Sequence, residues 1–128
     1  MRYAETDRMG YVYYGNYAQY YEIGRVEALR ELGISYKMME DEGIMLPVTS
    51  LETQYIKPAF YDDVLTISTS ITELPKVRIK FYYEVLNQKA ELLNKGTTTL
   101  VFIDRITNKP TPAPDYIIQK LEKHLQGN

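Results

Sequence analysis

The chain contains no cysteine and no tryptophan, and it has a single histidine among its 128 residues. Without cysteine there can be no disulfide, no thiolate nucleophile and no cysteine-bound metal, and such a composition is typical of an intracellular protein. One histidine is too few for a zinc site built from histidine and cysteine ligands. We therefore expect no metal site and no separate cofactor.

Long apolar runs and a large net charge are also missing. No run approaches the roughly 20 apolar residues that a membrane-spanning helix needs, and the N-terminus has no signal-peptide core. The net charge is −2 and the isoelectric point is about 5.4, so neither nucleic acid nor an anionic membrane is an expected partner. These absences predict a cytoplasmic protein without a membrane span.

Several common catalytic motifs are absent as well. There is no G-x-S-x-G turn for a serine hydrolase, no phosphate-binding P-loop and no dinucleotide fingerprint. What the chain has in excess is tyrosine, with 13 residues. Tyrosine suits half-exposed surfaces, where its ring is buried and its hydroxyl is bonded. The tyrosines indicate either an interface or ligand groove, or ordinary strand propensity.

Residues 16–33 have the pattern of an amphipathic helix. Asn16 is a good N-cap, and Gly33 is a good C-terminal stop. An apolar stripe recurs at intervals of three and four residues at Tyr17, Tyr20, Tyr21, Gly24, Ala28, Leu29 and Leu32. A glycine within a helix costs roughly 1 kcal/mol relative to alanine, so Gly24 predicts the close approach of another backbone, expected to be that of a sheet that crosses the helix. A second short helix is predicted over 36–42, capped by Ser35.

Most of the remaining chain has the alternation typical of β-strands. We predict the end of a first, short strand over 1–5 and a second strand over 45–56 that is irregular around Pro47. Further strands are predicted over 63–73, 76–87 and 92–104, the last of them central because it ends in a run that is apolar on both faces. A terminal helix is predicted over 116–125. Residues 1–128 are therefore predicted to form a single α+β domain, in which antiparallel strands cover one long helix. Exposed sheet edges make dimerisation a natural complement.

One carboxylate, that of Asp7, lies a few residues ahead of the predicted helix start. A helix start offers unpaired N–H groups and a positive dipole, which together can hold an oxyanion or an anionic ligand. A base beside an oxyanion site is the arrangement that ester or thioester cleavage requires. The pattern in residues 3–33 therefore predicts a site at which an ester or thioester is cleaved by water.

The same stretch resembles the signature of a known family. The matching residues are Tyr3, Glu5, Thr6, Asp7, Met9, Gly10, Val12, Tyr13, Asn16, Tyr17, Tyr20, Glu22, Gly24, Arg25, Glu27, Leu29 and Arg30. They are similar to the signature of the 4-hydroxybenzoyl-CoA thioesterase family, which has the hotdog fold, and the branch associated with the Tol-Pal system is the most similar. Members of that branch usually carry histidine where this chain has Tyr14, whereas the 4-hydroxybenzoyl-CoA branch has tyrosine there.

The resemblance implies a five-stranded antiparallel sheet wrapped around the long helix, in a homodimer or homotetramer. It implies hydrolysis of an acyl-CoA to a free acid and coenzyme A, which is part of the substrate. Asp7 would be the catalytic carboxylate, as general base or as nucleophile, and both routes stay open. The backbone N–H of Tyr14 or Gly15 would polarise the carbonyl oxygen.

Further candidate residues have two interpretations each. Tyr13 and Tyr17 either line an acyl pocket or pack in the core. The basic residues Lys76, Arg78 and Lys80 share a strand face, and they either bind the phosphates of coenzyme A or form a solvated surface. Two other functions also remain open on the same fold: a non-catalytic module that binds acyl-CoA or an acyl carrier protein, and an interaction protein that docks partners.

Overall fold

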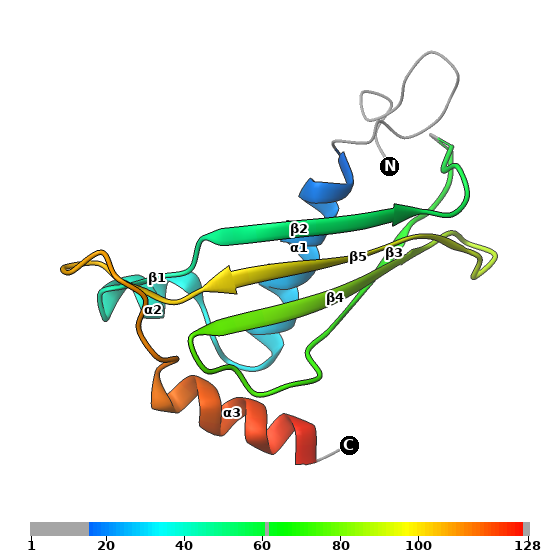
Figure 1. Ribbon diagram of the computed structural model, residues 1–128. Helices are drawn as coiled ribbons and strands as arrows, with labels where there is room; N and C mark the ends of the chain where they lie inside the picture. The colour runs from blue at the N-terminus through cyan, green and yellow to red at the C-terminus, as the bar shows by residue number, and fades with distance from the viewer. Residues whose placement is uncertain (1–15, 61, 127–128) are drawn as a thin grey trace.

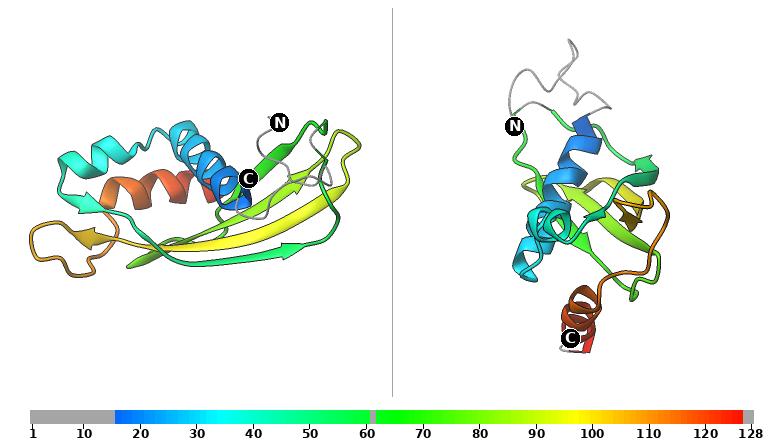
Figure 2. Two further views of the ribbon diagram at one scale, coloured as in Figure 1. Left: turned by 90° about the horizontal axis from the view of Figure 1, so that it is seen from above. Right: turned by 90° about the vertical axis from the view of Figure 1, so that its left-hand side faces the viewer.

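The computed structural model describes residues 16–60 and 62–126 and places three helices on one side of an antiparallel sheet (Figure 1; Figure 2). The elements in chain order are α1 (Asn16–Glu31), α2 (Tyr36–Asp41), β1 (Ile44–Met45), β2 (Val48–Tyr55), β3 (Thr66–Ser70), β4 (Arg78–Leu86), β5 (Leu92–Val101), β6 (Ile103–Asp104) and α3 (Asp115–Gln126). This architecture confirms the predicted α+β class.

The main sheet has the strand order β2-β5-β4-β3, and every neighbouring pair is antiparallel. β5 is central, as predicted. The strand predicted over 45–56 is divided at Pro47, which has no N–H to donate to a ladder, and β1 instead pairs with β6 in a separate two-stranded ribbon. The first strand of the predicted five falls in residues 1–5, outside the described residues, so four strands of the main sheet are described.

The two faces of the main sheet differ in chemistry. We call the face towards α1 the inner face and the opposite one the outer face. On β4, Phe81 and Val85 are buried on the inner face, whereas Lys80 and Glu84 are exposed on the outer face. In the described part of the chain all three helices lie on the inner side, and no helix covers the outer face (Figure 2).

α1 crosses the inner face with the predicted apolar stripe against the strands. Its buried hydrophobic side chains are Tyr17, Tyr20, Tyr21 and Leu29, none more than 9% exposed, and each such burial contributes roughly 1.5–3 kcal/mol. A Cβ built on Gly24 would lie 2.9 Å from Ile67 Cγ2, and Thr69 Oγ1 is closer still. The sheet does approach Gly24 closely, as predicted, but side chains of β3 make the contact rather than its backbone. Asn16 is the first helical residue rather than the cap, one position from the prediction.

The end of α1 follows its sequence signals. Gly33 has a φ of +77°, and the N–H of Ile34 donates to the carbonyl of Leu29 at 2.9 Å, which is the Schellman pattern. Ser35 then caps α2 by accepting a hydrogen bond from the N–H of Met38 at 3.1 Å. Both predicted boundaries are confirmed, and they turn the chain sharply from α1 into α2.

Candidate active site

The predicted catalytic residues Asp7, Tyr14 and Gly15 all lie outside the described part of the chain. The substrate-binding candidate Tyr13 also precedes Asn16, the first residue whose structure is described. Their roles therefore stay predictions. The structure defines the start of α1 and the side chains around it.

Three tyrosines gather at the start of α1. Tyr17 is 4% exposed, and its ring makes edge contacts with Tyr20 at 5.9 Å and with Tyr55 of β2 at 5.7 Å between ring centroids. Burial, with smaller contributions from Tyr21, Tyr55 and Asp63, raises the pKa of Tyr17 to about 12. Its hydroxyl therefore stays protonated at neutral pH, so it can donate a hydrogen bond but is a poor base. Tyr17 packs in the core, and Tyr55 beside it carries a half-exposed ring.

One turn further along α1, three side chains form a closed set of hydrogen bonds. Tyr21 Oη donates to Asn94 Oδ1 of β5 and lies 2.9 Å from Thr53 Oγ1 of β2. Asn94 Nδ2 donates to Thr53 Oγ1 at 2.8 Å and to the carbonyl oxygen of Gln54 at 3.1 Å. Tyr21 and Asn94 are fully buried. We call this set the Tyr21–Thr53–Asn94 triangle; it joins the helix to two strands.

The triangle depends on a glycine in β5. A Cβ built on Gly96 would lie 2.6 Å from Cε2 and Cζ of Tyr21, so a larger residue there would displace the ring. Burial raises the pKa of Tyr21, and hydrogen bonds from its partners oppose that shift in part. The hydroxyl is therefore neutral and serves as donor and acceptor at once.

A second buried network surrounds Arg25, further along α1. Arg25 is 7% exposed, and it donates from Nε to Tyr36 Oη at 2.9 Å and from Nη1 to Tyr83 Oη at 3.2 Å. The hydroxyl of Tyr83 lies 2.6 Å from Thr98 Oγ1. By their spacing of three positions on the helix, Glu22 and Arg25 could form a surface pair, but in the structure Arg25 faces the sheet while Glu22 is exposed to solvent. The network ties α1 to α2, β4 and β5.

The loop between β2 and β3 is fixed by one carboxylate. Asp63 accepts a hydrogen bond from the N–H of Phe60 at 2.9 Å and another from Gln88 Nε2 at 3.1 Å. The N–H of Val64 donates to Gln88 Oε1 at 3.0 Å. Because both oxygens of the buried Asp63 carboxylate are used in this way, it serves to hold the loop against the β4–β5 hairpin. The predicted strand over 63–73 is correspondingly shorter, and β3 begins only at Thr66.

Three exposed basic residues were predicted to bind phosphate: Lys76, Arg78 and Lys80. Alternation along β4 places Arg78 with the outer-face residues, whereas Tyr17 packs on the inner face. Val85 lies in the same cross-strand row as Tyr55, next to the start of α1. Arg78 precedes Val85 by seven positions (85 − 78), which is about 23 Å along the strand. A single protomer therefore does not bring these basic residues to the start of α1.

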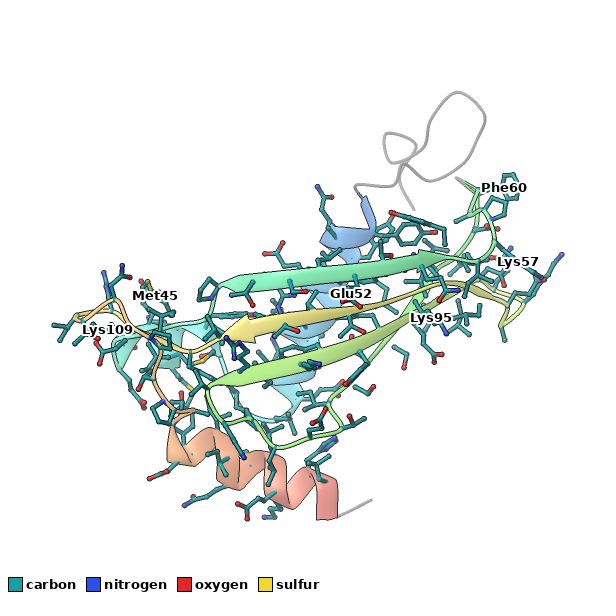
Figure 3. The ribbon with its side chains drawn as sticks, viewed as in Figure 1. Met45, Glu52, Lys57, Phe60, Lys95 and Lys109 are labelled. Carbon is teal, nitrogen blue, oxygen red and sulfur yellow. The ribbon has the colours of Figure 1, made fainter. Side chains whose placement is uncertain are left out.

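The outer face carries a depression of about 590 Å³. Its lining includes Glu52, Tyr82, Glu84 and Lys95, together with serine and threonine residues from β2, β3 and β5. Figure 3 shows Glu52 and Lys95 projecting from this face, with α1 behind the sheet. The depression carries charged side chains and is separated by the sheet from the start of α1, so we do not assign it to the acyl group.

The described residues contain neither a metal-binding cluster nor a membrane-spanning helix. Over 16–60 and 62–126, no group of three or more histidine, aspartate or glutamate side chains is arranged to hold a metal ion. Within the same ranges, no helix is both long enough and apolar enough to cross a membrane. Charged side chains here form surface contacts instead, such as that of Lys57 Nζ with Glu91 Oε2 at 2.7 Å.

Comparison with known proteins identifies the family. The model of the thioesterase-like superfamily matches residues 1–121. The chain belongs to the thioesterase-like superfamily. YneP of Bacillus subtilis is 34% identical over 110 residues, which cover 86% of this chain and 80% of YneP. The acyl-CoA thioester hydrolase YbgC of Escherichia coli is 31% identical over 121 residues, which cover 94% of this chain and 90% of YbgC.

A solved structure agrees with these sequence matches. The DHNA-CoA thioesterase of Staphylococcus aureus has a TM-score of 0.87 and 37% identity, with 100% of this chain and 91% of that chain covered. The predicted hotdog fold and the predicted class of enzyme, a thioesterase, are thereby confirmed.

Proposed function

We propose that this protein hydrolyses the thioester of a small acyl- or aroyl-CoA to a free acid and coenzyme A, in the cytoplasm, as one domain over residues 1–128. The observation that carries the proposal is the match to the thioesterase-like superfamily over residues 1–121. The relatives named for acyl-CoA hydrolysis support it. Within the superfamily, the signature around Asp7 favours the 4-hydroxybenzoyl-CoA thioesterase family and its Tol-Pal-associated branch.

In the proposed mechanism Asp7 is the catalytic carboxylate. Acting as a base, it takes a proton from the water that attacks the thioester carbonyl; acting as a nucleophile, it forms an anhydride that water then cleaves. Either route releases the thiol of coenzyme A and a free acid. The N–H groups of Tyr14 and Gly15, just ahead of α1, stabilise the developing oxyanion. Such a base is typically worth about 10²–10⁴ in rate and such a donor about 10²–10³, which suits an already activated thioester.

The acyl group is proposed to sit beside the start of α1, against Tyr13 and Tyr17. The contact of Tyr17 with the half-exposed ring of Tyr55 supports this location, because an aromatic wall there can pack on either a flat ring or a short chain. The neutral Tyr17 hydroxyl adds no charge that would oppose an apolar group. The structure favours neither an aliphatic nor an aromatic substrate.

We further propose a homodimer that pairs through β2, or a tetramer built from it. Among the described strands none pairs with the outer edge of β2, and seven of its eight residues are exposed. Val48, Leu51 and Tyr55 are 44–47% exposed on this strand, and apolar unpaired edges favour pairing with another chain.

Oligomerisation also bears on the basic residues. If Lys76, Arg78 and Lys80 bind the phosphates of the coenzyme A that Asp7 releases, a second copy must supply them, since in one protomer they lie far from the start of α1. Antiparallel pairing of two β2 strands reverses the second copy end for end. The end of the second copy's sheet that carries these basic residues then lies on the side where the first copy's α1 begins.

The proposal is tested with purified protein and a panel of aliphatic and aromatic acyl-CoAs, with free thiol release as the readout. We expect turnover of at least one class well above the rate in buffer. Binding of the CoA esters by calorimetry without thiol release would instead support the non-catalytic binding module. If the protein neither binds nor hydrolyses the CoA esters but captures a protein partner from an extract, the result would support the interaction protein that docks partners.

A further inference from the structure

We infer that the Tyr21–Thr53–Asn94 triangle is a positioning device that sets the start of α1 for turnover. The inference rests on the proposed function, in which the amides just ahead of Asn16 bind the carbonyl oxygen of the thioester. Tyr21, Thr53 and Asn94 touch no substrate in this scheme. They act through the helix.

The place of the triangle along α1 is the first observation. Tyr21 comes five positions after Asn16, about 7.5 Å along the helix axis. Tyr17 lies nearer the helix start, but its printed contact with Tyr55 of β2 is between ring edges, and the contact of Gly24 with β3 and the hydrogen bonds of Arg25 lie further along the helix. Among the described residues, the triangle is therefore the hydrogen-bonded attachment to the sheet that is nearest the first turn of α1.

The second observation is that the three groups satisfy one another. The carbonyl of Gln54 can only accept, so the side of the Asn94 amide that faces it is the NH₂. Asn94 then donates to Thr53, Tyr21 donates to Asn94, and the Thr53 hydroxyl is left to donate to Tyr21. Each partner comes from a different element, and a fully satisfied buried network holds its members in one arrangement.

The chain offers a matched control in Tyr83. Its ring stacks on that of Tyr21 at 4.4 Å between centroids and 11° between planes, and it is 1% exposed. Its hydroxyl is also doubly bonded, to Arg25 and Thr98, but Arg25 lies nine positions after Asn16. Tyr21→Phe and Tyr83→Phe therefore delete the same group from neighbouring stacked rings at different distances from the helix start.

The test measures kcat, KM and Tm for both variants on the best substrate of the panel. We expect both substitutions to lower Tm, whereas only Tyr21→Phe lowers kcat, by about tenfold with KM within about twofold, because small displacements of positioned groups cost rate steeply. Tyr83→Phe should keep kcat within about twofold of wild type. Equal losses of kcat in the two variants, or an unchanged kcat in Tyr21→Phe, overturn the inference.

Substitutions of Thr53 in β2 test the same positioning role, and they provide the test if Tyr21→Phe does not fold. Thr53→Val keeps the shape and removes the hydroxyl, while Thr53→Ser keeps the hydroxyl. We expect Thr53→Val to lower kcat as Tyr21→Phe does and Thr53→Ser to retain it. A loss of kcat in both, or in neither, contradicts a positioning role for the hydrogen bond.

Hydrogen exchange separates this inference from the proposed function. If the wild-type protein hydrolyses no thioester of the panel, the proposed function fails, and exchange of the amides of residues 20–24 still tests the triangle. Tyr21→Phe should raise exchange there by about tenfold more than Tyr83→Phe does, because it loosens this end of the helix locally. Equal exchange in both variants overturns the inference.

Discussion

The two halves of α1 are attached to the rest of the molecule in different ways. In the first half, Tyr17 and Tyr21 reach β2 and β5 through ring edges and directional hydrogen bonds. In the second half, Gly24 allows close contact with β3, Arg25 donates two buried hydrogen bonds, and the helix ends in the Schellman turn at Gly33. The comparison supports the proposal that one helix serves two purposes: its start is oriented for the proposed chemistry, and its remainder is held for stability.

The largest effect on stability is expected from Gly24→Val. The added branched side chain would meet Ile67 and Thr69 at a distance that no relaxed contact allows, and overpacking of this kind costs about 3 kcal/mol. Urea unfolding measures the loss, with Gly33→Ala as a control near the same helix, where the positive φ costs about 1 kcal/mol. A Gly24→Val protein as stable as wild type would show that the helix does not need this contact.

Arg25→Met should have the next largest effect. Methionine fills a similar volume, but Tyr36 and Tyr83 each lose a donor, and a buried group left without a partner costs about 1–3 kcal/mol. Denaturant unfolding should show the loss, while kcat of the folded enzyme stays close to wild type. A fall in kcat as large as that of Tyr21→Phe would erase the distinction between the two halves of α1.

The basic residues test whether the site is shared between copies. The combined change of Lys76, Arg78 and Lys80 to alanine should raise KM for an acyl-CoA about tenfold, through loss of charge-assisted contacts to phosphate. KM for the matching N-acetylcysteamine thioester, which has no phosphates, should not change. Lys57→Ala serves as a control and should leave KM for the acyl-CoA unchanged, since Lys57 is paired with Glu91. Mixed oligomers that contain copies of the triple-alanine variant and copies of Asp7→Asn should recover thioesterase activity. An equal rise in KM for both thioesters would rule out phosphate binding.

The smallest effect concerns alkaline pH. Below about pH 10 Tyr17 is protonated in both folded and unfolded chains, so it adds no pH dependence. Between that pH and its folded pKa of about 12, only the unfolded chain loses the proton, and the free energy of unfolding falls as pH rises. Wild type should therefore lose more stability from pH 9.5 to 11 than Tyr17→Phe, by urea midpoints. Parallel curves for the two proteins would contradict the buried, neutral phenol.

The parts of the fold that were predictable depend on neighbours in the sequence. The apolar stripe of α1, the stop at Gly33, the cap at Ser35 and the alternation along β4 all follow from residues a few positions apart. The division of the second strand at Pro47 follows from the same local chemistry, but which strand the detached piece would pair with does not.

The networks around the site were not predicted, because they join residues far apart in the sequence. Thr53 and Asn94 are separated from Tyr21 by 32 and 73 positions, and no local pattern specifies that contact. A signal did exist in β5, where Gly96 interrupts the strand between Lys95 and three threonines, since glycine within a strand often marks close approach. The partner of Arg25 was not predicted for a related reason: its helical spacing suggested Glu22 on the same helix, whereas its side chain contacts the sheet beneath.

The central claim is that chemistry depends on a carboxylate just ahead of α1. Asp7→Asn, assayed beside wild type for free thiol release, Tm and oligomeric state, tests it most directly. The account predicts that turnover falls by about 10²–10⁴, while Tm and oligomeric state stay unchanged. Turnover equal to that of wild type in the folded variant would contradict it.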